Sequence, residues 1–369
     1  MTANGIRPSL RPGPLSFSSG FAGEQKLVFS QNEFDTPLLF VINSNKLGFF
    51  FSRRTAKLRS TILSTTSLTL QKLMFVTKPR SFLKYVFENR FAVPSFNCSN
   101  LEMARAVVEA AVLEDAPVMI QTDFINFNYG GVDELYALVR TLSEPVNVPV
   151  LLHQDHPGED QNILRTLRRG YYSVMYDGGH LPVADNMRET ARFAEIVHAV
   201  GANLESEIGL FGGEYQGGEP VRAGAAEAAE MVKSGADTLA VSVGSEHGQS
   251  SRLDLQLLDE IAEKTGIPLV LHGGSGIHPE DAQAATKLNV YKINIGAALI
   301  NGFVAGLTEG ADLPADHEPK HQRILRHVVA KLRDIARSRL SLFGASGHGK
   351  KLLAQLGTAQ ADLSERVQR

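Results

Sequence analysis

Three histidines share one kind of sequence position and could together bind a metal ion. His156 in LLHQDHPGED, His247 in VSVGSEHGQ and His272 in LVLHGGSG each lie where an apolar run ends. Such runs are typical of parallel strands that are buried on both faces. Three neutral imidazoles leave a fourth coordination position open, as in catalytic zinc sites. We therefore expect one metal ion at these strand ends.

Asp155 immediately precedes His156 and is the obvious acid/base beside such an ion. A carboxylate at a metal site can exchange a proton with a substrate hydroxyl. It can also orient a liganding histidine without touching the substrate. We favour the catalytic role, because metal sites at barrel mouths collect functional carboxylates.

Eight apolar segments alternate with segments of helical spacing, which predicts a (β/α)8 TIM barrel. A doubly wound sheet would more often have fewer strands and an early phosphate-binding glycine fingerprint. The carboxyl ends of barrel strands meet at one mouth, so residues far apart in the sequence can share one ion. The predicted strands are 91–97, 117–122, 148–155, 173–178, 203–209, 237–244, 268–274 and 290–296.

The predicted barrel covers residues 74–345 and ends with additional helical sequence. The stretch HQRILRHVVAKLRDIARSRLSLFG is strongly amphipathic, which predicts an extra C-terminal helix packed on the barrel. Residues 346–369 are interpreted as a polar C-terminal tail.

Composition favours an enzyme of a reducing compartment, and we expect a cytoplasmic protein. The net charge of -3 gives no reason to expect nucleic acid. The apolar runs near Phe40 and Phe49 are shorter than the roughly 20 residues that span a bilayer, so no membrane partner is expected. The single cysteine, Cys98, is interpreted as a buried structural thiol rather than a nucleophile.

Residues 1–73 differ chemically from the rest of the chain. They hold nine Lys and Arg against three Asp and Glu, a net +6, which leaves 28 against 37, or -9, for the remainder. A basic, acid-poor, Ser- and Thr-rich segment is compatible with an organellar transit segment. We favour an upstream extension without a catalytic role, with Met74 as the natural start.

Seven ordered segments carry a specific family resemblance. They are FAVPSFNCSNLEMARAVVEAA, HQDH, SVMYDGGHLP, SEIGLFGG, SVGSEHG, LHGGSGI and KINIG. Their order and spacing between Met74 and Gly344 resemble the class II, metal-dependent fructose-bisphosphate and tagatose-bisphosphate aldolases. The resemblance implies a TIM barrel, zinc, and reversible cleavage of a phosphorylated ketose to dihydroxyacetone phosphate and an aldehyde. In such a reaction a bound cation stabilises the enediolate as a Lewis acid.

The resemblance also implies roles for individual residues. It assigns His156, His247 and His272 to the catalytic ion, Glu207 to a deeper metal position, and Asp155 to proton transfer at the aldehyde-side oxygen. Other histidines (His153, His180, His198 and His278) are expected to be packed or exposed side chains. Asp177 could flank a second, divalent or monovalent cation, or cap the next helix. Substrate and phosphate contacts are expected from Asn97, Gly248, Gly273, Ser275 and Asn294.

The loop after the fifth predicted strand, GLFGGEYQGGEP, resembles a mobile lid that carries a proton-transferring acid. Tyr215 stands where relatives usually carry the carboxylate, which leaves Glu214 or Glu219 as substitutes. Asp123 stands where relatives typically carry Ser, and Ala297 lacks a hydroxyl. A carboxylate at Asp123 would repel a second phosphate, so we expect a preference for a ketose with a single phosphate.

The sequence is also compatible with three other interpretations. Lys292 could form a Schiff base, although an ion-paired barrel residue is the simpler interpretation. The chain could instead be a metal-dependent barrel hydrolase or isomerase. It could also be a catalytically impaired family member that acts as a binding protein. By analogy with relatives, we expect a homodimer or homotetramer.

Overall fold

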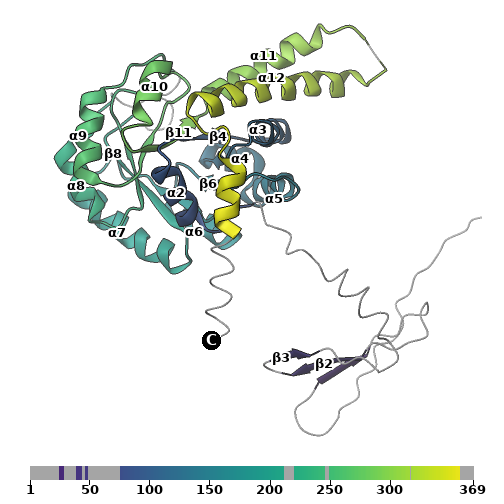
Figure 1. Cartoon of the computed structure of the whole chain (residues 1–369), viewed down its shortest axis with the longest axis horizontal. Helices are drawn as coiled ribbons and strands as arrows, with labels where there is room; N and C mark the ends of the chain where they lie inside the picture. Colours follow the sequence, from purple (N-terminus) through teal and green to yellow (C-terminus); the bar gives the residue numbers. More distant parts are fainter. Residues whose placement is uncertain are drawn as a thin grey trace, which may run out of the picture. The chain divides into compact units, whose positions relative to one another are not determined.

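Eight parallel strands close into a barrel in the computed structural model of the chain (Figure 1). The structure describes residues 75–211, 220–245, 249–315 and 317–357, together with three short strands near the N-terminus. Around the ring, each barrel strand pairs with the next in sequence, and the last pairs with the first. The strands are β4 (Val93–Asn97), β5 (Val118–Thr122), β6 (Val150–Gln154), β7 (Ser173–Tyr176), β8 (Asn203–Ile208), β9 (Thr238–Val241), β10 (Leu269–Leu271) and β11 (Val290–Ile295).

Each observed strand falls within its predicted segment, so the predicted barrel is confirmed. Several strands end earlier than predicted. In β10, for example, the ladder stops at Leu271, and Gly273 adopts a positive φ of 68°. Glycine adopts this conformation without strain, so the chain turns away there. The predicted residues beyond the ladders therefore form the loops of the barrel mouth.

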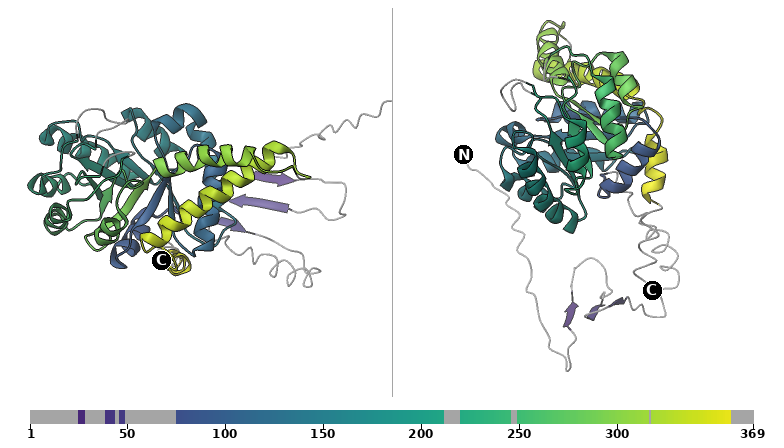
Figure 2. Two further views of the ribbon diagram at one scale, coloured as in Figure 1. Left: turned by 90° about the horizontal axis from the view of Figure 1, so that it is seen from above. Right: turned by 90° about the vertical axis from the view of Figure 1, so that its left-hand side faces the viewer.

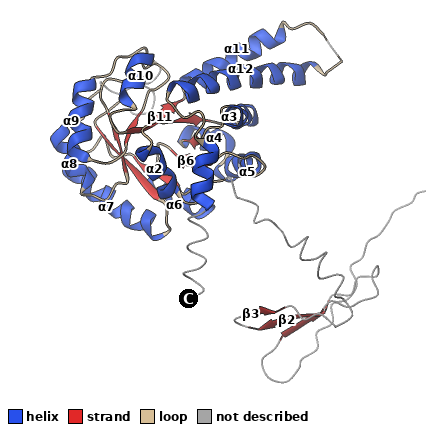
Figure 3. Ribbon diagram, in the orientation of Figure 1, coloured by secondary structure: helices blue, strands red, loops and turns tan. Residues whose placement is uncertain are grey.

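Helices surround the strands on the outside of the barrel (Figure 3). Every residue of the barrel strands is buried, which explains why most of their sequences are rich in apolar residues. The exception is β8, NLESEI, which carries polar side chains in the interior. The helices before the C-terminal pair are α2 (Pro79–Glu88), α3 (Leu101–Leu113), α4 (Phe124–Gly130), α5 (Val132–Ser143), α6 (Asp160–Arg169), α7 (Val183–Ala199), α8 (Ala225–Val232), α9 (Leu255–Thr265) and α10 (Pro279–Ala285).

The segment before the first barrel strand belongs to the barrel. The Val76 N–H donates to the carbonyl of Val150 at the start of β6 (2.9 Å). Phe82 and Val86 of α2 are fully buried, and α2 contacts β11. The barrel core therefore begins before β4, close to Met74.

Two further helices, α11 (Ala297–Ala311) and α12 (Lys320–Leu342), run side by side and extend beyond the ring (Figure 1, Figure 2). The amphipathic stretch predicted as a C-terminal helix is α12. Val328, Leu332, Ala336 and Leu340 form its buried face, which packs against α11 and α3. A short helix follows at 349–357, where Leu352 is buried.

The chain divides into two units, Met1–Gln71 and Lys72–Arg369. In the first unit the structure describes an antiparallel sheet of β1 (Gln25–Val28), β2 (Leu39–Asn43) and β3 (Lys46–Gly48). The role of this segment stays a prediction. Within the described ranges, no helix combines the length and the apolar character that crossing a bilayer requires.

Candidate active site at the barrel mouth

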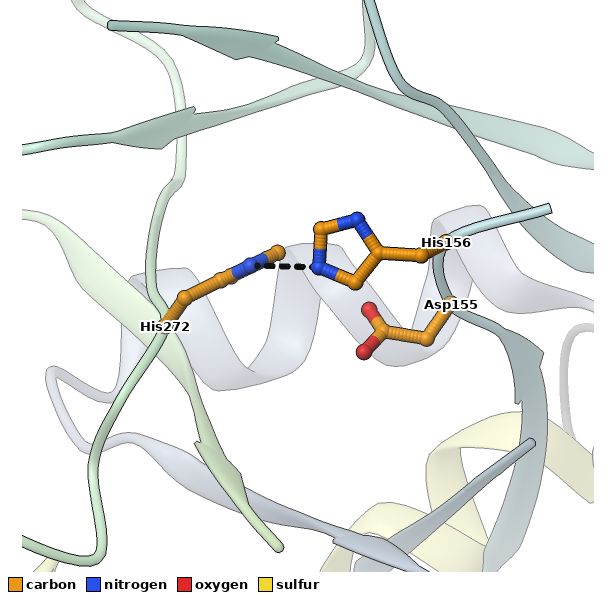
Figure 4. A group of neighbouring side chains, drawn as sticks. All are labelled: Asp155, His156 and His272. Carbon is orange, nitrogen blue, oxygen red and sulfur yellow. Dashed lines mark hydrogen bonds between the residues drawn. The ribbon is translucent and has the colours of Figure 1, made fainter. Parts of the chain in front are cut away.

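Asp155, His156 and His272 converge from opposite sides of the barrel (Figure 4). Asp155 and His156 directly follow β6, and His272 directly follows β10. These strands are four positions apart in a ring of eight, so their ends face each other across the mouth. All three side chains are buried.

The two imidazoles are in direct contact. His156 Nε2 and His272 Nδ1 are hydrogen-bonded at 3.1 Å, and the rings meet edge to face with centroids 4.9 Å apart. The other nitrogen of His156 hydrogen-bonds the Asp177 carboxylate (2.7 Å). Burial opposes the charged form of His156, but Asp155, Asp177 and Glu207 raise its pKa to about 10. Burial lowers the pKa of His272.

Asp155 accepts hydrogen bonds from side chains of two other strands. Gln121 Nε2 donates to Oδ2 (2.9 Å), and Asn294 Nδ2 lies 3.2 Å from both oxygens. Burial opposes ionisation, but Lys292 and His156 hold the Asp155 pKa well below its usual range. Asp155 is therefore an oriented carboxylate that can accept a proton.

A buried ion pair lies beneath the histidines. Lys292 Nζ donates to both oxygens of Glu205 (2.9 Å each) and lies 3.2 Å from His153 Nε2. Glu205 Oε1 in turn is 3.3 Å from His272 Nε2. Burial opposes the charge of Glu205, but Lys292 lowers its pKa to about 2. This confirms Lys292 as an ion-paired barrel residue, and His153 as a packed one.

The donor atoms present suit a divalent metal ion. One group of possible ligand atoms comes from Asp155, His156 and His272, and a second comes from His156, Asp177 and Glu207. Imidazole nitrogens and carboxylate oxygens are the donors that zinc accepts. A third group, His153, Asp155 and Glu205, surrounds the Lys292 ammonium and is thereby less suited to a cation. The first two groups share His156.

Glu207 lies close to His272, near the carboxyl end of β8. Its Oε2 is 3.7 Å from His272 Nδ1. Glu205 and Glu207 are two residues apart on β8, so both side chains point into the barrel. The arrangement brings Glu207 beside two of the expected metal ligands.

The loop after β10 contains the predicted phosphate residues Gly273 and Ser275. The Ser275 hydroxyl accepts a hydrogen bond from the Ala298 N–H in the first turn of α11 (3.1 Å). The Arg339 guanidinium donates to the Ser275 carbonyl (3.3 Å). The loop is therefore tied to both C-terminal helices.

Asn97 and Asp123 form a chain of side chains that leads to Asp155. The Asn97 amide nitrogen donates to Asp123 Oδ2 (3.0 Å), and Gln121 Nε2 donates to Asn97 Oδ1 (2.8 Å). Asp123 is buried and also caps α4, accepting from the Asn126 N–H (2.8 Å). Asp123 thus has a structural task as a helix cap, and Asn97 belongs to the same hydrogen-bonded group as Asp155.

Three predicted site residues, Glu214, His247 and Gly248, lie outside the described residues, as does Tyr215. Sequence reasoning missed Gln121 and Glu205. Gln121 is a polar residue inside an otherwise largely apolar strand, and that contrast was the available signal. Glu205 lies in NLESEI, where four of the six residues are polar, so no such contrast marked it. Of the remaining histidines, His180 is exposed and His198 pairs with Asp237 (2.9 Å). Cys98 is buried, as expected.

A cavity of about 870 Å³ adjoins His156 on the β6 and β7 side. His156 and Asp177 form part of its wall, together with residues of the loop before α6 and of α4. This volume would accommodate a small organic ligand. The site therefore combines donors for a cation, an ionised carboxylate and a neighbouring cavity.

Comparison with known proteins agrees with this arrangement. Residues 77–348 match the family described as fructose-bisphosphate aldolase class-II. The fructose-bisphosphate aldolase of Streptococcus pneumoniae is 35% identical over 292 residues, which cover 74% of this chain and 99% of the relative. That of Streptococcus pyogenes serotype M1 is 38% identical over 232 residues, covering 60% and 79% respectively.

A solved structure shares the fold of the barrel unit. The YdjI aldolase from Escherichia coli K12 aligns with a TM-score of 0.66 at 26% identity, over 73% of this chain and 98% of that one. Class II aldolases depend on a metal, for which the mouth of this barrel supplies suitable donors. The chain belongs to the class II fructose-bisphosphate aldolase family and is an aldehyde-lyase.

Proposed function

We propose that the chain is a zinc-dependent aldolase that reversibly cleaves a phosphorylated ketose to dihydroxyacetone phosphate and an aldehyde. The observation that carries the proposal is the convergence of Asp155 with His156 and His272 at the mouth. His156 and His272, with His247 as the expected third ligand, would hold the ion. Glu207 would hold it in a deeper position.

Asp155 accepts the proton of the substrate hydroxyl on the aldehyde-side carbon of the bond that breaks. The new carbonyl then forms on the aldehyde, and the electrons of the broken bond remain on the dihydroxyacetone phosphate half as an enediolate. The bound cation supplies Lewis-acid stabilisation of that negative charge. Gln121 and Asn294 keep the Asp155 carboxylate oriented through their amide hydrogen bonds.

The enediolate needs a proton on carbon to complete the reaction. We assign this step to Glu214, which follows the paired glycines of the lid sequence. The phosphate of the dihydroxyacetone phosphate half would bind at Gly273, Ser275 and Gly248, since exposed N–H groups after the last barrel strands favour an anion. Asn97 and Asn294 would contact the substrate beside Asp155.

The test is an assay of the metal-loaded protein with fructose 1-phosphate and fructose 1,6-bisphosphate. The release of dihydroxyacetone phosphate is monitored through its enzymatic reduction. Activity should disappear on chelation and return with zinc, and the His156→Ala/His272→Ala double variant should neither retain the ion nor turn over. Release of inorganic phosphate in place of triose phosphate would instead favour a hydrolase.

We also propose that the protein works as a homodimer or homotetramer. Ile300 and Val304, one turn apart on α11, are 50% and 59% exposed. Large exposed apolar side chains on one helix face favour a protein contact. Light scattering of wild type and of the Ile300→Lys/Val304→Lys variant tests this, because a fall in mass only in the variant would locate the contact.

A further inference from the structure

The cavity beside His156 is placed to receive the part of a substrate that lies beyond the bond to be cleaved. The phosphate residues Gly273 and Ser275 follow β10, whereas the cavity lies beside β6 and β7. Because β6 and β10 are opposite in the ring, the cavity and the phosphate loop lie on opposite sides of the His156–His272 pair. A ketose phosphate spanning that pair would therefore direct its remaining carbons into the cavity.

The wall of the cavity is rich in hydrogen-bond acceptors and carries negative charge. Glu159, Asp160 and Asp177 contribute carboxylates, and Asn128 and Asn162 contribute amides. The rings of Phe124 and Tyr176 add flat apolar surface. Carboxylates accept hydrogen bonds from sugar hydroxyls, amides both accept and donate them, and aromatic rings pack against the C–H faces of sugars.

No lysine or arginine lines this cavity among the residues that the structure describes. Arg192 reaches Asp160 from α7 (2.9 Å), but its guanidinium also binds Glu189 (2.8 Å). Its charge is thus matched by two carboxylates. The His156 imidazole on the cavity wall is likewise held by the Asp177 carboxylate (2.7 Å), so both of these basic groups already have carboxylate partners and the net effect on a phosphate dianion is repulsion.

A second feature of the barrel mouth also disfavours a second phosphate group. The backbone N–H of Asn126 and the side-chain amide of Asn97 both donate to the Asp123 carboxylate. These donors could otherwise bind an anionic substrate group near the end of β5. The Asp123 carboxylate occupies these donors instead.

We propose that the cavity binds an uncharged, polyhydroxylated chain, so that the aldehyde product carries no phosphate. This inference rests on the proposed aldolase function and specifies its substrate as a ketose with a single phosphate. Glu159, Asp160 and Asp177 then accept hydrogen bonds from hydroxyls. The same three carboxylates exclude a terminal phosphate.

The experiment runs the reaction in the direction of carbon–carbon bond formation. The zinc-loaded full chain is given dihydroxyacetone phosphate with either D-glyceraldehyde or D-glyceraldehyde 3-phosphate, and products are quantified by mass spectrometry. We expect kcat/KM for the uncharged aldehyde to exceed that for its phosphate by about tenfold or more, with the ratio falling as salt screens the carboxylates.

Variants connect this preference to the cavity. Glu159→Lys should shift the ratio several-fold towards the phosphorylated aldehyde, because it replaces a negative charge of the wall by a positive one. The Glu159 side chain does not cap α6, so the substitution removes no helix cap. Asp160→Asn should shift it in the same direction by releasing Arg192. Glu263→Lys makes the same charge change as Glu159→Lys on an exposed position of α9 and should leave the ratio at its wild-type value.

Each outcome separates the inference from the proposed function. Equal or better use of the phosphorylated aldehyde by wild type would overturn the inference while leaving the aldolase intact. If neither Glu159→Lys nor Asp160→Asn changes the ratio, the polyhydroxylated chain of the substrate binds outside this cavity. Formation of no ketose phosphate from either aldehyde would overturn the proposed function itself.

Discussion

Asp155 keeps a negative charge in a buried position because its surroundings compensate for the loss of water. Lys292 Nζ lies 3.6 Å from Oδ1, and amide groups of Gln121 and Asn294 donate to the carboxylate. An uncompensated buried carboxylate would instead bind a proton. The same contacts fix the direction in which Asp155 faces His156 and His272.

Replacing Asp155 by Asn should lower kcat by about 10²- to 10⁴-fold, the usual contribution of a positioned general base. The amide has nearly the same shape but cannot accept the hydroxyl proton. Bound zinc, measured by atomic emission, should remain stoichiometric. Loss of the metal with the activity would identify Asp155 as a ligand, and near-normal turnover would remove it from proton transfer.

Lys292 stabilises the barrel through Glu205, and the pH dependence of that contribution has a definite sign. The Glu205 pKa falls from a usual 4.5 to about 2 in the folded protein. A carboxylate with a lowered folded-state pKa contributes stability above its unfolded pKa and loses it as the pH falls. The contribution should therefore be complete above about pH 4.5 and vanish as the pH approaches about 2.

Lys292→Met should destabilise the protein by about 3 to 5 kcal/mol at neutral pH, because it leaves the Glu205 carboxylate buried without its ammonium partner. Urea unfolding measures the loss. The Lys292→Met/Glu205→Gln double variant should recover part of it, since the Glu205 charge that lost its partner is also removed. Lys287→Met, at an exposed position, is the matched control. Equal stability of Lys292→Met and this control would exclude a stabilising ion pair.

At the scale of elements, alternation along each strand decides which residues can meet inside the barrel. Glu205 and Glu207 on β8, and Lys292 and Asn294 on β11, occupy alternate positions that share the inner face. This much was predictable from the sequence, as were the strand ends that position His156 and His272. The strand positions alone were enough to predict that these histidines share one mouth, because a parallel barrel brings the carboxyl ends of all its strands together.

Partners across the ring were not predictable in the same way. Glu205 meets Lys292 because the stagger of the closing strands brings β8 and β11 to the same level, and no single strand sequence encodes that stagger. The Gln121–Asn97–Asp123 chain depends on which way each amide group faces. That orientation follows from the assembled network rather than from the residue types.

The pairing of α11 and α12 depends on glycine at the contact. A Cβ on Gly306 would lie 3.1 Å from Val328 Cα, a backbone atom that cannot move aside as a side chain can. Gly306→Val should therefore separate the helices and cost about 1 to 3 kcal/mol. Asn301→Val adds a similar side chain on an exposed position of α11 and is the control. Equal melting temperatures for both variants would show that the helices do not pack closely in solution.

At the scale of the whole molecule, the boundary near Met74 separates two different kinds of sequence. The unit Lys72–Arg369 contains the whole barrel, and the family match begins at residue 77. The segment 1–73 is basic, whereas the remainder carries a net charge of -9. The relative from Streptococcus pneumoniae is covered over 99% of its length by 74% of this chain.

A chain that starts at Met74 should fold and catalyse like the full chain. Phe75 and Val76 would remain to pair with Val150, and α2 would remain to bury Phe82 and Val86. The melting temperature and the rate of triose phosphate release should match those of the full chain. A chain that starts at Lys84 removes Phe82 with its buried ring and should lose about 3 kcal/mol or more, since deleting a buried Phe side chain costs 3 to 5 kcal/mol. If the Met74 chain unfolds or loses turnover while the full chain retains both, residues 1–73 contribute to the barrel and the proposed boundary is wrong.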